Sequence, residues 1–194
     1  MDVEAVATAA LPAMVQLNGT TTVKSSSYFG YGQSYEATSS GTGIIVGKSD
    51  TELLIVTNAH VVDNIDNLKC VFSDGTSASC SVKGSKSDQD IAVAAVSLSD
   101  ISSDTASNIA IAELEDSSDI KVGQQVVAIG NALGEGQSVT TGIISAKDRS
   151  ITVNNVTFTG LLMTDAAINS GNSGGALLNL SLIHISEPTR RTPI

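Results

Sequence analysis

Ser173 lies in a stretch of the chain where a side chain could act as a nucleophile. Three glycines surround this serine, Gly171, Gly174 and Gly175, and an apolar run follows them. Glycine weakens a strand or a helix because it loses the most backbone freedom on folding. So many glycines therefore indicate either an ordinary tight turn or a place where backbone amides come close to a ligand.

His60 and Asp90 are the residues that could activate this serine. A serine hydroxyl needs a base to become a nucleophile, and the base needs a carboxylate that orients it. Outside residues 180–194, His60 is the one histidine of the chain, and it follows an apolar segment. We expect it at a junction between a strand and a turn, whereas Asp90 begins another apolar segment. The order His60, Asp90, Ser173 predicts a site in the crevice between two halves of the chain.

Short β-branched segments alternate with turn residues along the chain and predict an all-β barrel or sandwich. A polar connector, Ser99–Ser118, divides the expected strands into two similar halves. Residues 19–41 are rich in Ser, Thr, Gly and Tyr and are expected to form a long, mobile surface loop. Ala5–Ala10 is expected to form a short helical turn. The expected strands are Val15–Leu17, Gly43–Val46, Leu53–Val56, Leu68–Phe72, Ala78–Val82, Ile91–Val96, Gln125–Ile129, Val139–Ser145, Ile151–Val156, Leu161–Met163 and Gly175–Leu178.

The composition restricts the possible partners. Apolar residues make up 41% of the chain and charged residues 15%, which is typical of a globular protein. The net charge of −10 argues against a nucleic-acid partner, because neutralising phosphates requires clustered Lys and Arg. The first residues lack the cationic leader of a secretory signal. No apolar run approaches the ~20 residues of a membrane span.

Cys70 and Cys80 flank a predicted hairpin turn at Asp74 and Gly75. Facing strands could bring the two thiols within bridging distance, which would indicate an oxidising compartment. Equally, both could be buried as small apolar side chains. The spacing of the cysteines and histidines matches no zinc pattern, so we expect no metal and no cofactor.

Residues 180–194 differ from the rest of the chain. They hold two of the three arginines, two of the three prolines and one of the two histidines. Their sequence resembles a translated sequencing adapter, so we interpret them as a non-native tail and leave them out of the fold prediction.

Five segments of the chain, in this order, resemble the HtrA (Deg) family: "TNAHVV", "DIAV", "VGQQVVAIGNALG", "SVTTGIISAKDR" and "TDAAINSGNSGGALLN". The resemblance covers roughly residues 3–179. It implies a trypsin-like serine endopeptidase with two six-stranded antiparallel β-barrels of chymotrypsin type, the second of them truncated at its C-terminus. Residues 1–105 would form the first barrel, with His60 and Asp90, and residues 106–179 the second, with Ser173.

The same resemblance implies a role for each residue of the site. His60 would be the general base, Asp90 would orient it, and Ser173 would be the nucleophile. The "DIAV" segment favours Asp90 over the nearby Asp88. The backbone N–H groups of Gly171 and Ser173 are the expected oxyanion hole, and such a donor is worth about 3–4 kcal/mol of barrier.

Asn172 and Ala167 are the candidate residues for substrate binding. Ala167 lies where digestive members of the wider superfamily place the floor of their specificity pocket, and an uncharged alanine predicts a preference for small aliphatic residues. Asn172 cannot form the ion pair with a new N-terminus that activates trypsin. We therefore expect control by rearrangement of loops such as Asn131–Ser138.

The function implied is hydrolysis of unfolded or damaged polypeptides through an acyl-enzyme, as in protein quality control. The family also suggests an extracytoplasmic or envelope-associated location, a homotrimer and a PDZ domain elsewhere in the full-length protein. The chain itself is expected to be a protease-domain fragment of low stability and activity. One alternative is a catalytically silent, peptide-binding module. An α/β-hydrolase esterase is rejected, because that fold needs a histidine after the serine and acid, with helices between its strands.

Overall fold

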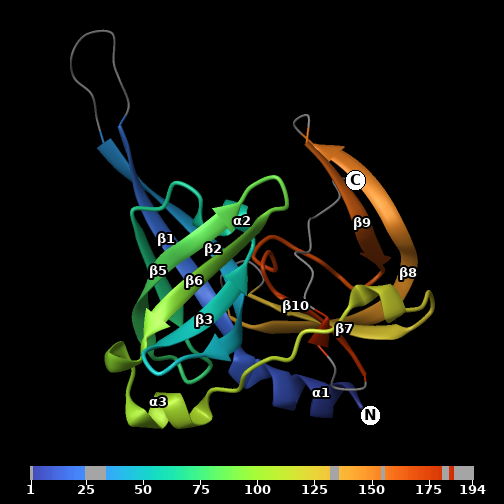
Figure 1. Cartoon of the computed structure of the whole chain (residues 1–194), viewed down its shortest axis with the longest axis horizontal. Coiled ribbons are helices and arrows are strands. Elements are labelled where there is room, and N and C mark those ends of the chain that lie inside the picture. The colour runs from blue at the N-terminus through green and yellow to red at the C-terminus, as the bar shows by residue number, and fades with distance from the viewer. Residues whose placement is uncertain (1, 25–33, 132–135, 154–155, 181–183, 186–194) are drawn as a thin grey trace, which may run out of the picture.

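A computed structural model of the chain describes residues 2–24, 34–131, 136–153, 156–180 and 184–185. Two β units lie side by side in Figure 1. The first is a closed barrel of six strands in the order β1-β2-β3-β6-β5-β4, in which every neighbouring pair is antiparallel. Its strands are β1 Met14–Lys24, β2 Ser34–Lys48, β3 Glu52–Thr57, β4 Asn67–Val71, β5 Ser77–Lys86 and β6 Ile91–Ser97. The predicted six-stranded first barrel is therefore confirmed.

The barrel closes because each strand turns one apolar face inward. In β3, Leu53 and Ile55 are fully buried and alternate with half-buried neighbours, as the two-residue period of a strand requires. They pack with Val15, Leu17 and Ile45 from the adjoining strands. Two of the predicted site residues lie next to strands of this barrel, His60 shortly after β3 and Asp90 directly before β6.

The loop predicted over residues 19–41 is wrong in its described parts. β1 and β2 pair without interruption from Met14 opposite Ile44 to Lys24 opposite Ser34, so this polar segment is a long hairpin. Threonine favours extended backbone, and the hairpin continues a pair of strands that the core already anchors. Its polar composition reflects exposure to solvent on both faces. Residues 25–33 lie outside the described residues.

The second half is an open half-barrel of five strands in the order β11-β10-β7-β8-β9. The strands are β7 Gln125–Gly130, β8 Ser138–Val153, β9 Val156–Thr164, β10 Ala176–Asn179 and β11 His184–Ile185. β7 and β10 lie at its centre and are buried on both faces. Leu178 packs in a core cluster that includes residues of the first half, while Leu177 packs in the core of the second half. The predicted chymotrypsin-type fold, with an incomplete second barrel, is confirmed.

One expectation for the second half needs correction. The predicted strand Ile151–Val156 is not a separate strand, because β8 runs on to Val153 and β9 begins at Val156. Residues 154–155 between them lie outside the described residues. β11 lies in the segment interpreted as a non-native tail, and its two residues pair with Leu177 and Leu178.

The helices of the described residues are short, and the first of them packs at the junction of the two halves. The predicted turn at Ala5–Ala10 is part of helix α1, Val3–Ala10, which lies beneath β7 in Figure 1. Val6 of this helix packs with Val127, so α1 joins the core of the second half. The polar connector contains α3, Ser103–Asn108, and no strand. The remaining helical turns are α2 Ala59–Val62 and the 3₁₀ turns Leu11–Ala13, Leu98–Asp100 and Ser117–Asp119. Among the residues described, no helix has the length and apolar character that crossing a membrane requires.

The two cysteines lie on neighbouring strands, joined by the predicted turn at Asp74 and Gly75. Cys70 lies opposite Ala78, and Cys80 lies opposite Leu68, so the two thiols are offset by two positions. Both are free, and Cys70 is fully buried. A hydrogen bond with Cys80, together with burial, strongly raises the pKa of the Cys70 thiol. In the structure Cys70 is therefore a buried small side chain, whereas Cys80 is half-buried beside it.

Candidate active site

His60 lies on α2, a single helical turn that begins directly after β3. This is the predicted junction between a strand and a turn. Ala59, Val61 and Val62 of this turn are buried, and their side chains anchor it to the barrel core. His60 points the other way, and 42% of its side chain is exposed. The imidazole is thus held firmly at its base and is open to an incoming molecule.

Asp90 comes from the turn between β5 and β6, and its carboxylate binds His60. The ring Nδ1 lies 2.8 Å from Oδ2 and 3.0 Å from Oδ1. The backbone N–H of His60 also donates to Oδ1 at 3.0 Å. Asp88, the alternative acid, lies on the surface 4.0 Å from Lys86. The structure therefore pairs His60 with Asp90.

The backbone of Asp90 is strained. Its φ of 53° lies in the left-handed region, which costs an L-residue other than glycine about 1–2 kcal/mol. Such a conformation persists where surrounding contacts hold it, and it occurs often at functional sites. Here the contacts to His60 hold the carboxylate, and the Asn58 side chain donates to the Asp90 carbonyl oxygen at 2.8 Å.

Ser173 is the second residue of the second of two consecutive β-turns. In the first turn Asn172 N–H donates to the carbonyl of Asn169 at 3.1 Å, and in the second Gly175 N–H donates to the carbonyl of Asn172 at 2.8 Å. Gly171 and Gly174 occupy the third positions, with φ of 93° and 79°. A positive φ at that position is what a type II turn requires. The glycines around Ser173 are therefore needed for the path of the backbone.

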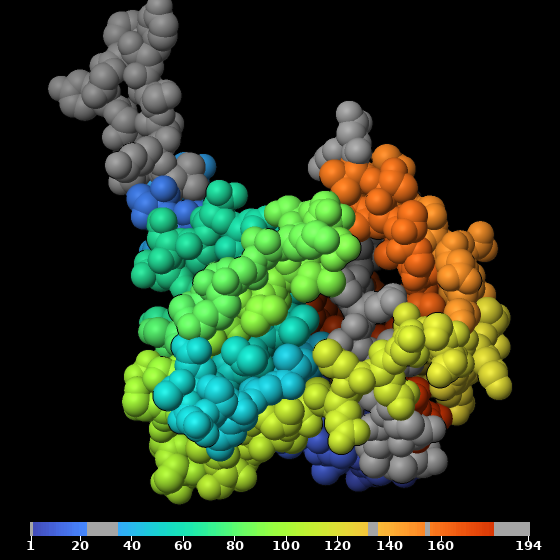
Figure 2. All heavy atoms as spheres, viewed as in Figure 1, coloured from blue at the N-terminus to red at the C-terminus, as the bar shows by residue number. Residues whose placement is uncertain are grey.

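The first barrel holds this double turn from one side. Thr42 on β2 donates its backbone N–H to the carbonyl of Ser173 at 2.8 Å and its hydroxyl to the carbonyl of Gly171 at 2.9 Å. The same hydroxyl accepts the backbone N–H of Asn131 at 2.7 Å. Gly174 N–H donates to the Asn58 side chain at 2.6 Å. Strands of both halves thus converge on the segment that carries Ser173, and Figure 2 shows a furrow between the halves on one face of the molecule.

Comparison with known proteins agrees with this architecture. The sequence profile of the family described as "Trypsin-like peptidase domain" matches residues 41–182. The chain belongs to this family. Its peptidase domain is similar to the "Serine protease Do-like HtrA" of Bacillus subtilis, with 37% identity over 177 residues, which cover 87% of this chain and 38% of that protein. It is also similar to the "Periplasmic serine endoprotease DegP" of Salmonella typhimurium, with 40% identity over 151 residues, 77% of this chain and 30% of that protein.

A solved structure gives the same result for the fold of the peptidase domain. A variant of the HtrA-type protease AlgW, solved with a decapeptide, superposes with a TM-score of 0.80 and 30% identity, over 95% of this chain and 56% of that one. The peptidase domain is therefore of the HtrA-like, trypsin-fold serine protease type. The chain spans less than two-fifths of the length of the two curated relatives named above.

The peptidase domain places the candidate substrate-binding residues at different depths. Asn172 is 4% exposed and lies against Gly130, and its Oδ1 has no hydrogen-bond partner among the described residues. Ala167 is exposed, and its carbonyl accepts the Thr140 hydroxyl at 3.0 Å. Their roles in binding substrate stay predictions. Of the loop Asn131–Ser138, residues 132–135 lie outside the described residues.

Asn58 and Thr42 are site residues that the sequence analysis missed. Both are fully buried polar residues, and each contacts the segment that carries Ser173. The signal available for Asn58 was its position two residues before His60, at the end of an apolar strand. Thr42 gave no comparable signal, because polar residues precede it along the whole of the hairpin.

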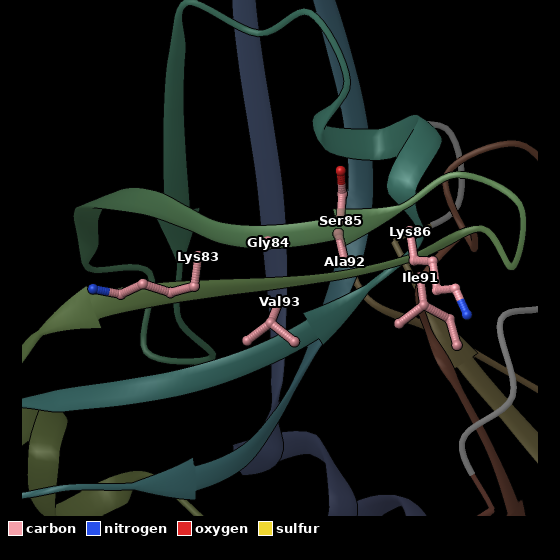
Figure 3. A pocket seen from close by; sticks show the side chains of 7 residues that line it. All are labelled: Lys83, Gly84, Ser85, Lys86, Ile91, Ala92 and Val93. Carbon is pink, nitrogen blue, oxygen red and sulfur yellow. The ribbon is translucent and has the colours of Figure 1, made fainter.

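A second hollow of the peptidase domain lies on the outside of the first barrel, between β5 and β6. It has a volume of about 400 Å³ and is wide open to solvent. Figure 3 shows Lys83 and Lys86 pointing to opposite ends of it. Lys83 is paired with Glu52 at 2.6 Å. The two ammonium groups therefore do not converge on a common position in this hollow.

Proposed function

We propose that this chain is a serine endopeptidase domain in which His60, Asp90 and Ser173 form a catalytic triad. The observation that carries the proposal is the bidentate contact between the His60 ring and the buried carboxylate of Asp90, at 2.8 and 3.0 Å. Thr42 and Asn58 hold the segment of Ser173 beside that pair. An exposed imidazole, a buried acid and a serine in a glycine turn are the parts that acyl transfer requires.

The proposed reaction has two halves. In the first, Ser173 Oγ attacks the carbonyl carbon of a peptide bond while His60 Nε2 takes the hydroxyl proton. His60 then gives that proton to the leaving amine, the C–N bond breaks, and an acyl-enzyme remains. In the second half, a water molecule attacks the acyl group while His60 accepts its proton, and the ester bond to Ser173 breaks as His60 returns the proton. Asp90 orients the ring throughout.

The oxyanion of each intermediate needs donors that are already in place. The N–H groups of Gly171 and Ser173 are the proposed pair. A φ of 93° at Gly171 fits the third position of a type II turn, which a residue with a side chain rarely adopts. Each such donor is worth a factor of about 10²–10³ in rate.

The proposed substrates are unfolded or damaged polypeptides, as in protein quality control, and the proposed location is outside the cytoplasm. The relatives named as serine proteases support a polypeptide substrate, and the one named periplasmic supports the location. Assembly into a homotrimer and the presence of a PDZ domain in the complete protein are proposals of the same kind.

Labelling with a fluorophosphonate probe tests the triad. We expect the probe to attach to Ser173, as read by mass spectrometry, and Ser173→Ala to abolish the label. Ser170→Ala is the matched control, because it removes an exposed hydroxyl from the same loop and should leave labelling unchanged. Cleavage of a chemically unfolded protein, compared with the same protein in its folded form, tests the substrate class.

Two results would overturn the proposal. A folded chain whose Ser173 stays unlabelled would favour the catalytically silent, peptide-binding module. A label that persists in Ser173→Ala would mean that another residue is the nucleophile.

A further inference from the structure

Asn58 occupies a position where an asparagine normally caps a helix. It is the N-cap residue of α2, and asparagine is among the best N-cap residues because its side-chain oxygen can accept a free N–H of the first turn. The Asn58 side chain makes no such bond. The N–H of His60 donates to the carboxylate of Asp90 instead. The amide of Asn58 is therefore used elsewhere.

That amide joins the acid of the site to the turn of the nucleophile. Its Nδ2 donates to the carbonyl oxygen of Asp90 at 2.8 Å, and its Oδ1 accepts the N–H of Gly174 at 2.6 Å. The two partners lie 32 and 116 positions away in the chain and belong to different halves of the molecule. No atom of Asn58 is exposed, so solvent does not compete for either bond.

The chemistry of the two partners requires an amide here. One partner is a carbonyl oxygen, which only accepts, and the other is a backbone N–H, which only donates. An amide offers one donor group and one acceptor on a single rigid plane. A carboxylate would set an acceptor against the Asp90 carbonyl, and an apolar side chain would leave both buried groups unpaired.

We propose that Asn58 is a positioning residue of the active site, whose amide sets the distance between the Asp90–His60 pair and the Ser173–Gly174 turn. The proposal deepens the endopeptidase function proposed above and rests on it. Thr42 binds the carbonyl of Ser173 and Asn58 binds the next N–H, so both sides of the Ser173–Gly174 peptide are held by the first barrel. The acid and the nucleophile are thereby both held in place by residues of the first barrel.

Asn58→Leu tests the proposal, because leucine has a similar size and makes neither bond. We expect kcat for a peptide substrate and the rate of fluorophosphonate labelling to fall about 100-fold, which is the cost of a displacement of roughly 1 Å at a reacting group. KM should change little, since Asn58 is buried and does not contact substrate. Should the leucine variant fail to fold, Asn58→Ser, which leaves room for water, carries the same test.

Two NMR signals report on the positioning without any need for activity. The Nδ1 proton of His60, assigned by its absence in His60→Gln, reports on the contact with Asp90. Exchange of the Gly174 amide with solvent reports on its bond to Asn58. In Asn58→Leu we expect the ring proton to shift or broaden and the Gly174 amide to exchange faster.

Thr105→Val is the control for a general loss of stability. Thr105 is a buried residue with side-chain hydrogen bonds to Thr76 and Ser102, and it belongs to α3, which lies at the other end of the first barrel from α2 in Figure 1. The valine should lower stability while leaving both signals and kcat unchanged. The proposal is overturned if Asn58→Leu leaves both signals as they are in the unmutated chain, or if Thr105→Val alters them equally. A third outcome separates the two proposals. If Asn58→Leu alters both signals but the unmutated chain never labels at Ser173, the endopeptidase function is overturned and the positioning by Asn58 is retained.

Discussion

Asp90 contacts His60 at two places, the ring and the backbone. The ring Nδ1 lies 2.8 Å from one carboxylate oxygen, and the backbone N–H donates to the other at 3.0 Å. An ionised carboxylate only accepts hydrogen bonds, so Nδ1 carries a proton, and in the neutral ring the lone pair is then on Nε2. The exposed edge of the imidazole is therefore the edge that can act as a base.

Asp90→Asn should nearly abolish activity. The amide can donate a hydrogen bond to Nδ1, which would move the ring proton to Nε2 and remove the base. We expect kcat to fall about 10⁴-fold, measured with a peptide substrate and by fluorophosphonate labelling. Asp88→Asn is the control, because Asp88 is exposed and should have no effect. A loss of less than tenfold in Asp90→Asn would contradict the proposed triad.

Gly174→Ala should destabilise the fold more than an alanine at a glycine of similar conformation. A methyl group at this position meets the carbonyl oxygen of Thr42 and the hydroxyl of Thr57, both in the first barrel. Together with the left-handed backbone, this predicts a loss of roughly 2–5 kcal/mol of unfolding free energy, measured by urea denaturation. Gly75→Ala is the control, with a φ of 82° and open space around it, and should cost about 1–2 kcal/mol. Equal losses would show that the contact with Thr42 and Thr57 has no effect.

Thr42→Val should weaken the turn that carries the proposed oxyanion hole. Valine has the shape of threonine but no hydroxyl, so the Gly171 carbonyl and the Asn131 N–H would lose a buried partner. Each unpaired group costs about 1–3 kcal/mol. We expect a lower unfolding free energy and a lower kcat. Thr38→Val on the same strand changes an exposed residue and should be nearly neutral. If both valines behaved alike, the role of the Thr42 hydroxyl would be refuted.

Because of Cys70, the stability of the protein should fall as the pH rises in the alkaline range. Its hydrogen bond with Cys80, and then its burial, raise the pKa of its thiol, so the folded chain holds this proton more tightly than the unfolded chain. The resulting stabilisation is complete below the ordinary thiol pKa of about 8.5 and declines as the pH rises above it. Between pH 8 and 10 (roughly the range around that pKa), the unfolding free energy of Cys70→Ala should therefore fall less steeply than that of the unmutated chain. Identical slopes in the two proteins would exclude this effect.

The strands of the first barrel could be predicted because their signal is local. Alternating burial in β3 follows directly from alternating residue types at Leu53 and Ile55. The polar hairpin of β1 and β2 was missed for the opposite reason. Much of it has no apolar face, and only the pairing of Met14 with Ile44 and of the residues beyond it shows that the backbone is extended.

Local sequence likewise pointed to the chemistry of the site, because a histidine after an apolar strand and a serine among glycines are recognisable within a few residues. The contacts that hold these groups depend on the folded chain. His60 and Asp90 are 30 positions apart, and Asn58 and Gly174 are 116 positions apart, so no short segment contains either pair. Asn58 has the sequence signature of a helix cap, and the fold uses its amide between the two halves instead. Hydrogen bonding depends on distance and direction in space, and closure of the barrel against the second half is what brings these groups within 3 Å of their partners.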